Sequence, residues 1–365
     1  MRAALLERAG DPVRVVDDID IEAPRAGEVR VRVSHCGLCH SDVTILDGAF
    51  TTPIVVGHEA AGVVESVGDG VTSLHPGDHV VLTPIPPCGR CYWCVRGEPG
   101  VCVNGGAVPT GTFADGSTRL SRNGDIVYRG LGVGAFGELV VTQETGAVKI
   151  ADDVPLEVAC VIGCAVQTGV GAVFNTAGVL PGDTVLVMGL GGVGMSAVQG
   201  ARLAGASRVV ASDPIESRRE AASKLGATDL IDPSSEDVAT RVRELTDGVG
   251  VDHALECVGN GKLVETAIDT IRPGGRVIMV GAPPIDHSVT INAAVLFGIS
   301  EKKLLGCFLG SSNSLREVPR LLDLWRAGSL DLESMITSRR PLDEVNDAIA
   351  DLRAGRGIRT VLEVG

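Results

Sequence analysis

The chain has 365 residues, of which 44% are hydrophobic, and a formal net charge of -14 at pH 7. This length is sufficient for two domains with their own cores, and the unbroken negative charge disfavours nucleic acid and anionic membrane surfaces. No apolar run reaches the roughly 20 residues of a membrane-spanning helix, and residues 1–16 lack the pattern of a signal peptide. We therefore expect a cytoplasmic protein with a small-molecule partner, and with no nucleic-acid or membrane partner.

Up to about residue 165 the apolar runs are short, rich in Val and bounded by turn residues, which predicts a β-rich domain. The clearest strands cover 29–33, 62–67 and 79–82. Candidate metal ligands lie between and after these runs: Cys39, His58 with Glu59 beside it, and Cys164. Two thiolates and one imidazole hold Zn²⁺ with a fourth position open for chemistry. Spacing alone leaves other donors available and does not choose between Cys36 and Cys39; the others are His35, His40, His75 and Cys160.

A second cysteine set follows the third strand, with the pattern C-x2-C-x2-C-x7-C at Cys88, Cys91, Cys94 and Cys102. Four thiolates close a tetrahedral zinc site completely, so this set predicts a structural metal. The ten cysteines of the chain fall largely in metal-ligand clusters. Reduced thiolates, rather than the disulfides of a small secreted protein, are therefore expected.

From about residue 180 strands alternate with helices. Strands are predicted at 184–188, 208–212, 251–258 and 276–280, and helices at 195–203 and 216–225, the second ended by Gly226. Such alternation predicts a parallel sheet with helices on both faces. Residues 359–364 read as a strand that returns to the first domain. We expect residues 1–165 and 307–365 to form one domain, with its zinc lobe at 88–102, and residues 166–306 to form the other.

A dinucleotide site is predicted at the first strand-helix junction of the second domain. The residues Gly189-Leu190-Gly191-Gly192-Val193-Gly194 have G-x-G-x-x-G spacing between a strand and a helix. Asp213 stands nineteen positions beyond Gly194, at the end of the next strand. Its carboxylate can accept from ribose hydroxyls and would repel a 2'-phosphate, which favours NAD over NADP. Arg218 is the nearest cation, either a cofactor contact or a solvated helix residue.

Together these features resemble one family. The further motifs that carry the likeness are GLCHSD at 37–42, GHEAAG at 57–62, VIGC at 161–164 with Thr168 and Gly169, and GIRTVL at 357–362. Over nearly its whole length the chain resembles the zinc-dependent alcohol dehydrogenases of the medium-chain dehydrogenase/reductase superfamily. The resemblance implies an α/β fold in which a Rossmann NAD-binding domain is inserted in a β-rich GroES-like catalytic domain.

The resemblance also implies residue roles. Cys39, His58 and Cys164 are implied as ligands of a catalytic zinc, with Glu59 as a carboxylate able to approach the metal. The resemblance implies that Asp42 orients His58 and that Ser41 passes the alcohol proton outward. It also implies that Thr168 lies beside the nicotinamide and that His40 and Arg359 reach the pyrophosphate. Many relatives continue the proton path with a histidine where this chain has Thr44. The cysteines expected only to pack are Cys36, Cys160, Cys257 and Cys307.

The expected activity is hydride transfer between a primary alcohol or its aldehyde and NAD, with two zinc ions per chain, one catalytic and one structural. One alternative is a formaldehyde dehydrogenase that needs glutathione or mycothiol; His40 is shared with that branch, but residues 103–106 lack the arginine expected to hold glutathione. Another is a nucleotide-binding protein without turnover. The chain also resembles nitrosodimethylaniline-linked alcohol dehydrogenases at 309–311 and 318–322, in which NAD can be held as a prosthetic group.

The substrate pocket is expected to be wide. By motif alignment Pro84 and Gly130 replace large aromatic residues of ethanol-oxidising relatives, and Ala282 replaces a larger aliphatic one. We therefore expect aromatic or longer-chain alcohols to be preferred, and Gly130→Phe to penalise them. Phe50 and Phe308 either line this pocket or fill the core. A homodimer or homotetramer is expected.

Overall fold

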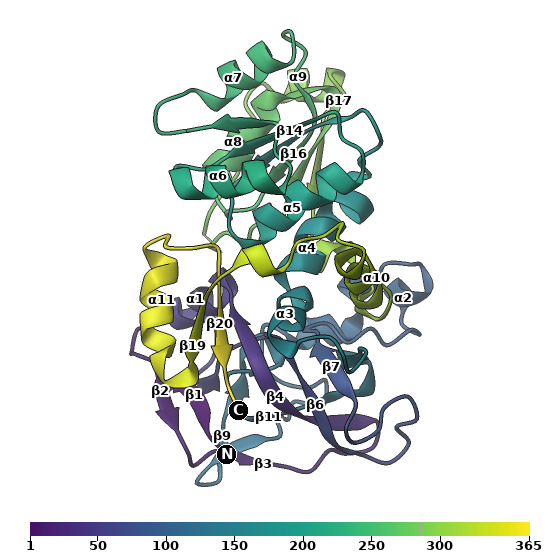
Figure 1. Ribbon diagram of the computed structural model, residues 1–365, viewed down its shortest axis with the longest axis vertical. Helices are drawn as coiled ribbons and strands as arrows, with labels where there is room; N and C mark the ends of the chain where they lie inside the picture. Colours follow the sequence, from purple (N-terminus) through teal and green to yellow (C-terminus); the bar gives the residue numbers. More distant parts are fainter. Residues whose placement is uncertain (285) are drawn as a thin grey trace. The chain divides into compact units, whose positions relative to one another are not determined.

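The computed structural model describes residues 1–284 and 286–365, which divide into two compact units (Figure 1). The first comprises Met1–Ala165 and Asn313–Gly365, and the second comprises Val166–Ser312. The second boundary lies after residue 312 and not, as the sequence suggested, after residue 306. The reason is the 3-10 helix η8 (Leu309–Ser311), which is tied to the second unit because Asn175 Nδ2 donates to the Gly310 carbonyl over 3.0 Å.

The first unit is built on a seven-stranded sheet. Its central strand, β4 (Glu28–Leu38), pairs with three others. The other strands are β6 (Glu59–Val67), β7 (His79–Leu82), β11 (Leu139–Gln143), β12 (Ala147–Lys149), β19 (Ile336–Pro341) and β20 (Arg359–Glu363). The three strands predicted before residue 83 fall within β4, β6 and β7. The prediction that the tail returns is also confirmed, because Thr360 of β20 lies opposite Leu38 of β4.

Two smaller sheets complete the strands of the first unit. They contain β1 (Ala3–Leu6), β2 (Arg14–Val16), β5 (Ile54–Val55) and β10 (Tyr128–Arg129), and then β3 (Asp20–Ile21), β8 (Leu120–Arg122) and β9 (Asp125–Ile126). Its helices are α1 (His40–Thr44), α2 (Tyr92–Val95), α3 (Leu156–Ala159), α10 (Ser314–Arg326) and α11 (Val345–Arg353).

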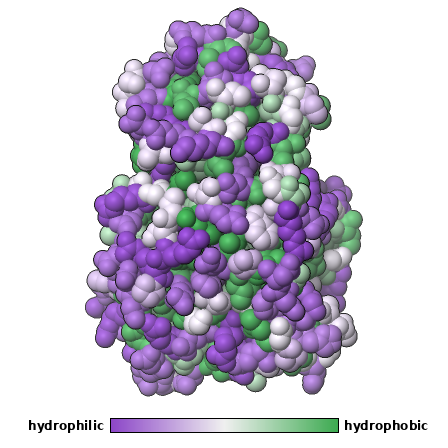
Figure 2. Space-filling view, viewed as in Figure 1, coloured by the Kyte–Doolittle hydropathy of each residue, from purple (hydrophilic) through white to green (hydrophobic). Residues whose placement is uncertain are grey.

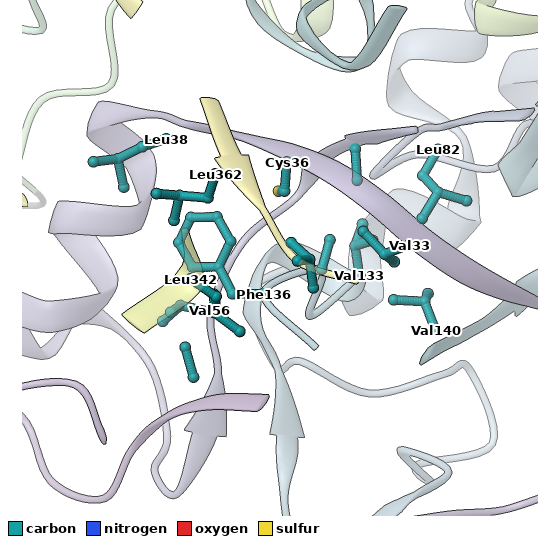
Figure 3. Packing of buried hydrophobic residues seen from close by; sticks show 14 of the residues in the cluster. Val33, Cys36, Leu38, Val56, Leu82, Val133, Phe136, Val140, Leu342 and Leu362 are labelled. Carbon is teal, nitrogen blue, oxygen red and sulfur yellow. The ribbon is translucent and has the colours of Figure 1, made fainter. Parts of the chain in front are cut away.

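The core of the first unit lies between its sheet and the tail elements. Phe136 is fully buried, and in Figure 3 its ring lies close to Val56, Leu342 and Leu362. Residues distant in sequence thus share one hydrophobic cluster. Burying such side chains contributes roughly 1.5–3 kcal/mol each, so this cluster fixes β4 and β6, whose ends adjoin Cys39 and His58.

The second unit contains a six-stranded parallel sheet in the order β15-β14-β13-β16-β17-β18. These strands are β13 (Thr184–Met188), β14 (Arg208–Ser212), β15 (Asp229–Ile231), β16 (Val251–Glu256), β17 (Ile271–Met279) and β18 (Lys303–Gly306). The strands predicted at 184–188 and 208–212 coincide with β13 and β14. The order reverses between β13 and β16, and nucleotides bind at such switch points in open α/β sheets.

Helices α5 (Gly192–Leu203), α6 (Glu216–Leu225), α7 (Val238–Leu245), α8 (Gly261–Thr270) and α9 (Ala294–Ile299) belong to the second unit, and α4 (Ala165–Gly171) spans the boundary. Helix α6 has the predicted bounds, and Gly226 ends it with φ +118°. Helix α5 begins three residues before the predicted Met195, because the last glycines of the G-x-G-x-x-G motif form its first turn.

On the face shown in Figure 2, hydrophilic residues predominate and hydrophobic ones are interspersed among them. Within the described ranges, no single helix is long and apolar enough to cross a membrane. One bent pair of helical segments, Leu156–Gly163 and Ala165–Ala177, reaches that length and composition when the two are taken together.

Candidate functional site

Cys39, His58 and Cys164 come together in the first unit. One ligand atom from each lies within 4.8 Å of the others, and His58 Nε2 is 3.3 Å from Cys164 Sγ. Cys39 and His58 are buried and Cys164 is half-buried. Ligands of a tetrahedral zinc lie roughly 3.5–3.8 Å apart, given Zn–S and Zn–N bonds of about 2.3 and 2.1 Å. The spacing and the donor types fit a zinc ion with three protein ligands.

Asp42 organises this cluster from behind. Its Oδ1 accepts from His58 Nδ1 over 3.0 Å and from the Gly57 backbone N–H over 3.1 Å. Its Oδ2 accepts from the Cys39 backbone N–H over 3.0 Å. Because Nδ1 of His58 donates to a carboxylate, Nε2 keeps the free lone pair with which it can bind a metal. Asp42 thus orients one candidate ligand and anchors the backbone of another.

Glycines make room for this arrangement. Gly57 has φ +92°, and a Cβ there would lie 2.6 Å from the backbone nitrogen of Phe136. Only glycine therefore lets the chain turn from β5 into His58 without strain. Gly37 leaves the space that the Glu59 carboxylate occupies, since a Cβ at residue 37 would lie 2.3 Å from Glu59 Oε1.

Glu59 is fully buried beside the cluster. Its Oε2 accepts from the Ala165 backbone N–H over 3.1 Å, and Oε1 is 3.4 Å from Arg359 Nε. Burial raises the pKa of Glu59 to about 7, although Arg359 opposes the shift. Arg359 is itself buried and donates from Nη1 to the Leu38 carbonyl over 2.7 Å. The structure therefore places Arg359, implied at a pyrophosphate, against Glu59 in the metal-side unit.

The thiol of Cys39 is electrostatically distinct from those of the packing cysteines. A hydrogen bond from Cys164 lowers the pKa of Cys39 well below its ordinary value, and the same contact raises the pKa of Cys164. Burial raises the pKa of Cys36 and Cys160 well above the ordinary value. A thiolate is therefore favoured at Cys39 and disfavoured at Cys36, which faces the core on β4.

The polar residues after Cys39 lie on α1. Ser41 Oγ is 3.8 Å from Cys39 Sγ, so its hydroxyl borders the cluster. His40 is exposed at the start of the helix, and Thr44 Oγ1 donates to the His40 carbonyl over 3.3 Å. Thr44 thus lies one turn beyond His40 on the same helix and is half-buried.

The four-cysteine set also converges, with its sulfur atoms within 4.8 Å of one another. Backbone N–H groups point at the sulfurs: Cys91 donates to Cys88 Sγ and Cys88 donates to Cys102 Sγ, both over 3.3 Å. The N–H groups of Cys94 and Val103 lower the pKa of Cys91 to about 6. Four convergent sulfurs with N–H···S support fit a closed structural zinc site.

In the second unit the glycine-rich turn joins β13 to α5. Gly189 has φ +89°, and a Cβ on Gly194 would lie 1.8 Å from the Gly189 carbonyl oxygen. A Cβ on Gly191 would meet nothing within 4 Å. The first and third glycines are thus required by the fold of the turn, whereas Gly191, with Gly192 and Val193 beyond it, leaves the backbone open to a ligand at the helix N-terminus.

Asp213 lies at the end of β14 beside this turn. Its Oδ2 accepts from the Leu190 N–H and its Oδ1 from the Ile215 N–H, both over 2.8 Å. Each carboxylate oxygen keeps a further lone pair for a ribose hydroxyl. Arg218 Nη1 is 3.9 Å from Asp213 Oδ2, which places this cation at the same edge. Thr168 is buried on α4.

The residues expected to widen the substrate pocket need one correction. A Cβ on Gly130 would lie 2.9 Å from both Val55 O and Val56 Cα. Gly130 therefore packs against the backbone and does not replace an aromatic side chain by empty space, so Gly130→Phe would disturb the fold and is no test of pocket size. Phe50 packs against the core cluster, whereas Phe308 and Ala282 are exposed in the second unit. Pro84 is buried and lines a cavity.

Comparison with known proteins adds a family context. Residues 25–152 match the alcohol dehydrogenase GroES-like domain, and residues 192–324 match the zinc-binding dehydrogenase family. An NDMA-dependent alcohol dehydrogenase of Amycolatopsis methanolica is 40% identical over 366 residues, covering 99% of this chain and 98% of the relative. An S-(hydroxymethyl)glutathione dehydrogenase of Escherichia coli is 38% identical over 370 residues, covering 99% of each chain.

Among solved structures, the benzyl alcohol dehydrogenase of Acinetobacter calcoaceticus superposes with a TM-score of 0.93 at 31% identity. The match covers all of this chain and 99% of the other. The predicted fold class, a Rossmann domain inserted in a GroES-like domain, is therefore confirmed by both sequence and structural likeness.

Proposed function

The chain belongs to the zinc-dependent alcohol dehydrogenases of the medium-chain dehydrogenase/reductase superfamily, and from that premise we propose that it transfers hydride between a primary alcohol and NAD. The observation that carries the proposal is the buried three-donor cluster of Cys39, His58 and Cys164. Three protein donors leave a fourth position for substrate, which a purely structural site would not. When bound there, zinc supplies Lewis acidity that lowers the pKa of an alcohol.

The residues around the cluster support this chemistry. Asp42 fixes the tautomer of His58 and holds the backbone N–H of Cys39, so two donors are preorganised. The Ser41 hydroxyl, 3.8 Å from Cys39 Sγ, is proposed to accept the proton of the alcohol and to pass it toward Thr44 or water. Glu59, buried and paired with Arg359, is a carboxylate that could approach the metal.

The cofactor proposed is NAD. The open backbone at Gly191 and the N-terminus of α5 suit a pyrophosphate, and the Asp213 carboxylate suits a ribose 2'-hydroxyl. Arg359 and His40 are proposed as further contacts to the pyrophosphate. Thr168 is proposed as a contact to the nicotinamide. A nicotinamide, when bound, supplies the hydride acceptor. Placing a 2'-phosphate beside Asp213 would cost on the order of several kcal/mol. Comparing kcat/KM for NAD and NADP in the unmodified protein and in Asp213→Gly tests this; equal use of both cofactors by the unmodified protein would refute it.

The proposed substrates are aromatic or longer-chain primary alcohols and their aldehydes. Support comes from the likeness to a benzyl alcohol dehydrogenase and from Pro84 at a position that is aromatic in ethanol-oxidising relatives. A series from methanol to benzyl and octyl alcohols, followed by nicotinamide absorbance, tests the preference. Since a close relative is NDMA-dependent, the series is run with free NAD and with NDMA as acceptor. Turnover only with NDMA would indicate a cofactor that does not dissociate, and no turnover with either would favour the non-enzymatic alternative.

A thiol-dependent formaldehyde dehydrogenase is the second candidate, because the S-(hydroxymethyl)glutathione dehydrogenase is nearly as similar as the alcohol dehydrogenase. Against it, residues 103–106 lack the arginine that would be expected to hold a glutathione carboxylate. Formaldehyde oxidation with and without added glutathione or mycothiol separates the two. A strict thiol requirement would replace the first candidate by the second.

We also propose a homodimer. Strand β18 is the edge of the six-stranded sheet, and apolar residues of the neighbouring helix α9 are exposed, among them Val295 (69%) and Ile299 (72%). An open edge with apolar neighbours suits pairing with a second copy. Light scattering is expected to give about twice 37.6 kDa, or a multiple of that dimer. A monomer would refute the proposal.

A further inference from the structure

Arg129 is a buried arginine that lacks an acidic partner in the described part of the chain. It ends β10, is 4% exposed, and its backbone N–H donates to the Gly111 carbonyl over 3.1 Å. Its guanidinium Nη1 donates to the Val141 carbonyl over a long 3.4 Å, and Nε has no hydrogen-bond partner. Across residues 1–284 and 286–365, no carboxylate oxygen comes within the 4.0 Å of an ion pair with it.

A neighbouring arginine shows the contrast. Arg119 and Arg129 both contact the Phe113 ring, with Cζ atoms 4.6 and 3.6 Å from its centroid. Arg119 is neutralised by Glu28, to which Nη2 and Nε donate over 2.6 and 3.1 Å. Arg129 has the ring face and the long hydrogen bond to the Val141 carbonyl. A cation–π contact offsets a small part of the cost of removing a full charge from water.

Arg129 nevertheless stays charged at neutral pH. Burial lowers the pKa of its guanidinium to about 9, with a smaller effect from the charge of Arg119. A buried cation that is still protonated and has an unpaired N–H is a recognition group for an anion.

Arg129 lines a cavity of about 20 Å³. A single water needs roughly 10–15 Å³ of such volume, so the cavity has room for one or two solvent-sized atoms, enough at most for the two oxygens of a carboxylate. Asn104, Gln143 and Pro84 also line it. Asn104 Nδ2 donates to Gln143 Oε1 over 2.6 Å and to the Pro86 carbonyl over 2.8 Å, which makes this wall rigid and polar.

Two chain segments lead from residues of this cavity, Pro84 and Arg129, toward the metal cluster. Pro84 lies two residues beyond Leu82. The Leu82 carbonyl oxygen would lie 2.6 Å from a Cβ on Gly163, the residue before Cys164. Arg129 is followed by Gly130, where a Cβ would lie 2.9 Å from Val56 Cα, and Val56 lies two residues before His58. Two residues of extended chain span about 7 Å. A substrate with its hydroxyl at the cluster could therefore place a second polar group at Arg129.

We propose that Arg129 is the recognition residue of a subsite for a small monoanion of carboxylate type, held by the Nε–Nη2 edge of the guanidinium. The source is either the carboxylate of an acidic alcohol substrate or a free anion. The first source rests on the proposed dehydrogenase function and the second does not. Planar side-on pairing of two N–H donors with two oxygens is the geometry in which arginine binds carboxylates most strongly.

The free-anion source is tested by thermal melts of the zinc-loaded protein with increasing acetate, at an ionic strength held constant by the bulky buffer anion HEPES. Acetate is expected to raise the Tm of the unmodified protein by a few degrees in a saturable manner. The rise should be lost in Arg129→Gln, partly kept in Arg129→Lys, and unchanged in the control Arg8→Gln, whose side chain is 83% exposed.

The substrate source is tested with 4-(hydroxymethyl)benzoate against 4-methylbenzyl alcohol. The ratio of their kcat/KM values is expected to fall roughly ten- to a hundredfold in Arg129→Gln, as for loss of a charged hydrogen bond. A Tm response to acetate without a change in the kcat/KM ratio would identify a free anion as the ligand of Arg129. A changed kcat/KM ratio would identify the substrate carboxylate as that ligand. Failure to oxidise any alcohol would count against the proposed function and leave the acetate arm valid.

The inference is overturned if acetate has no saturable effect on the unmodified protein and the substrate ratio does not change in the Arg129 variants. If Arg129→Gln does not fold, the acetate titration of the unmodified protein and the Arg129→Lys variant decide the outcome in the same way.

Discussion

The two cysteine clusters of this chain are assembled in opposite ways. The four-cysteine cluster takes all its sulfurs from residues 88–102, whereas Cys39, His58 and Cys164 come from segments far apart in the sequence. In the first cluster the support is local, from backbone N–H groups of the same loop. In the second it comes from a buried carboxylate, Asp42, and from the pairing of β4 with β6.

Because of this difference, we expect loss of the metal to have different consequences at the two clusters. Around the first cluster apolar side chains are exposed, including Tyr92 (64%) and Val95 (69%), so the loop has little core of its own. A metal there contributes folding free energy directly. Around the second cluster, His58 and Asp42 are each 1% exposed and held by the sheet. A metal there is expected to contribute chemistry while the fold persists without it.

The largest expected effect is on activity in Cys39→Ser. Removing one of three donors should release about one zinc per chain and lower kcat/KM by roughly a thousandfold or more, since Lewis-acid stabilisation is worth several kcal/mol. The circular dichroism spectrum and the Tm should change little, because the surrounding strands keep their core. Zinc content and alcohol oxidation are measured on the same preparation. Loss of activity with both zinc ions retained would contradict the assignment.

Cys94→Ser should act on stability. Loss of the closed site should lower the free energy of unfolding of the lobe by on the order of several kcal/mol, and expose residues 88–112 to proteolysis. Limited digestion with mass spectrometry locates the cut. Cys307→Ser, at a half-buried cysteine outside both clusters, is the control. If the zinc is lost but the lobe stays resistant, the loop does not depend on its metal and the contrast between the clusters fails.

A smaller effect is expected from Asp42→Asn. The two carboxylate oxygens of Asp42 accept from three N–H donors. An amide would turn an NH₂ group toward at least one of them, so zinc affinity or kcat/KM should fall about 10–100-fold. Zinc release to a chelator and kcat/KM are the measurements. The matched control is Asp47→Asn, at an exposed aspartate that pairs with Arg353. Equal behaviour of the two variants would show that Asp42 has no orienting role.

The same contrast explains which parts of the structure were predictable. The four-cysteine spacing, the glycine-rich turn and the strand at 184–188 are local patterns, and local geometry dictates them. The choice of Cys39 over Cys36 is not local. It depends on where β4 ends and α1 begins, because Cys36 still faces the core while Cys39 has left the strand.

Three other features depended on chain segments that no motif records. Gly130 aligns with an aromatic position, but the backbone of Val55 and Val56 occupies the space beside it. Arg129 gave no signal because its lack of a partner is a property of the whole fold. The boundary at residue 312 likewise depends on the contact between Asn175 and Gly310. Long-range packing decided each of these, and a single sequence contains no direct measure of it.

The smallest expected effect, on Cys36→Ala, sharpens the comparison most directly. Cys36 is fully buried in the core cluster, its Sγ lies 3.6 Å from the Gly37 carbonyl oxygen, and burial raises its pKa well above that of an ordinary thiol. It should therefore behave as a small hydrophobic residue. Replacing it by Ala removes one buried atom, so we expect a loss of about 1 kcal/mol in the free energy of unfolding, with zinc content and kcat/KM retained. Denaturant melts and metal analysis beside Cys39→Ser give the test. A variant that lost zinc would mean that the ligand position belongs to β4 and not to the start of α1.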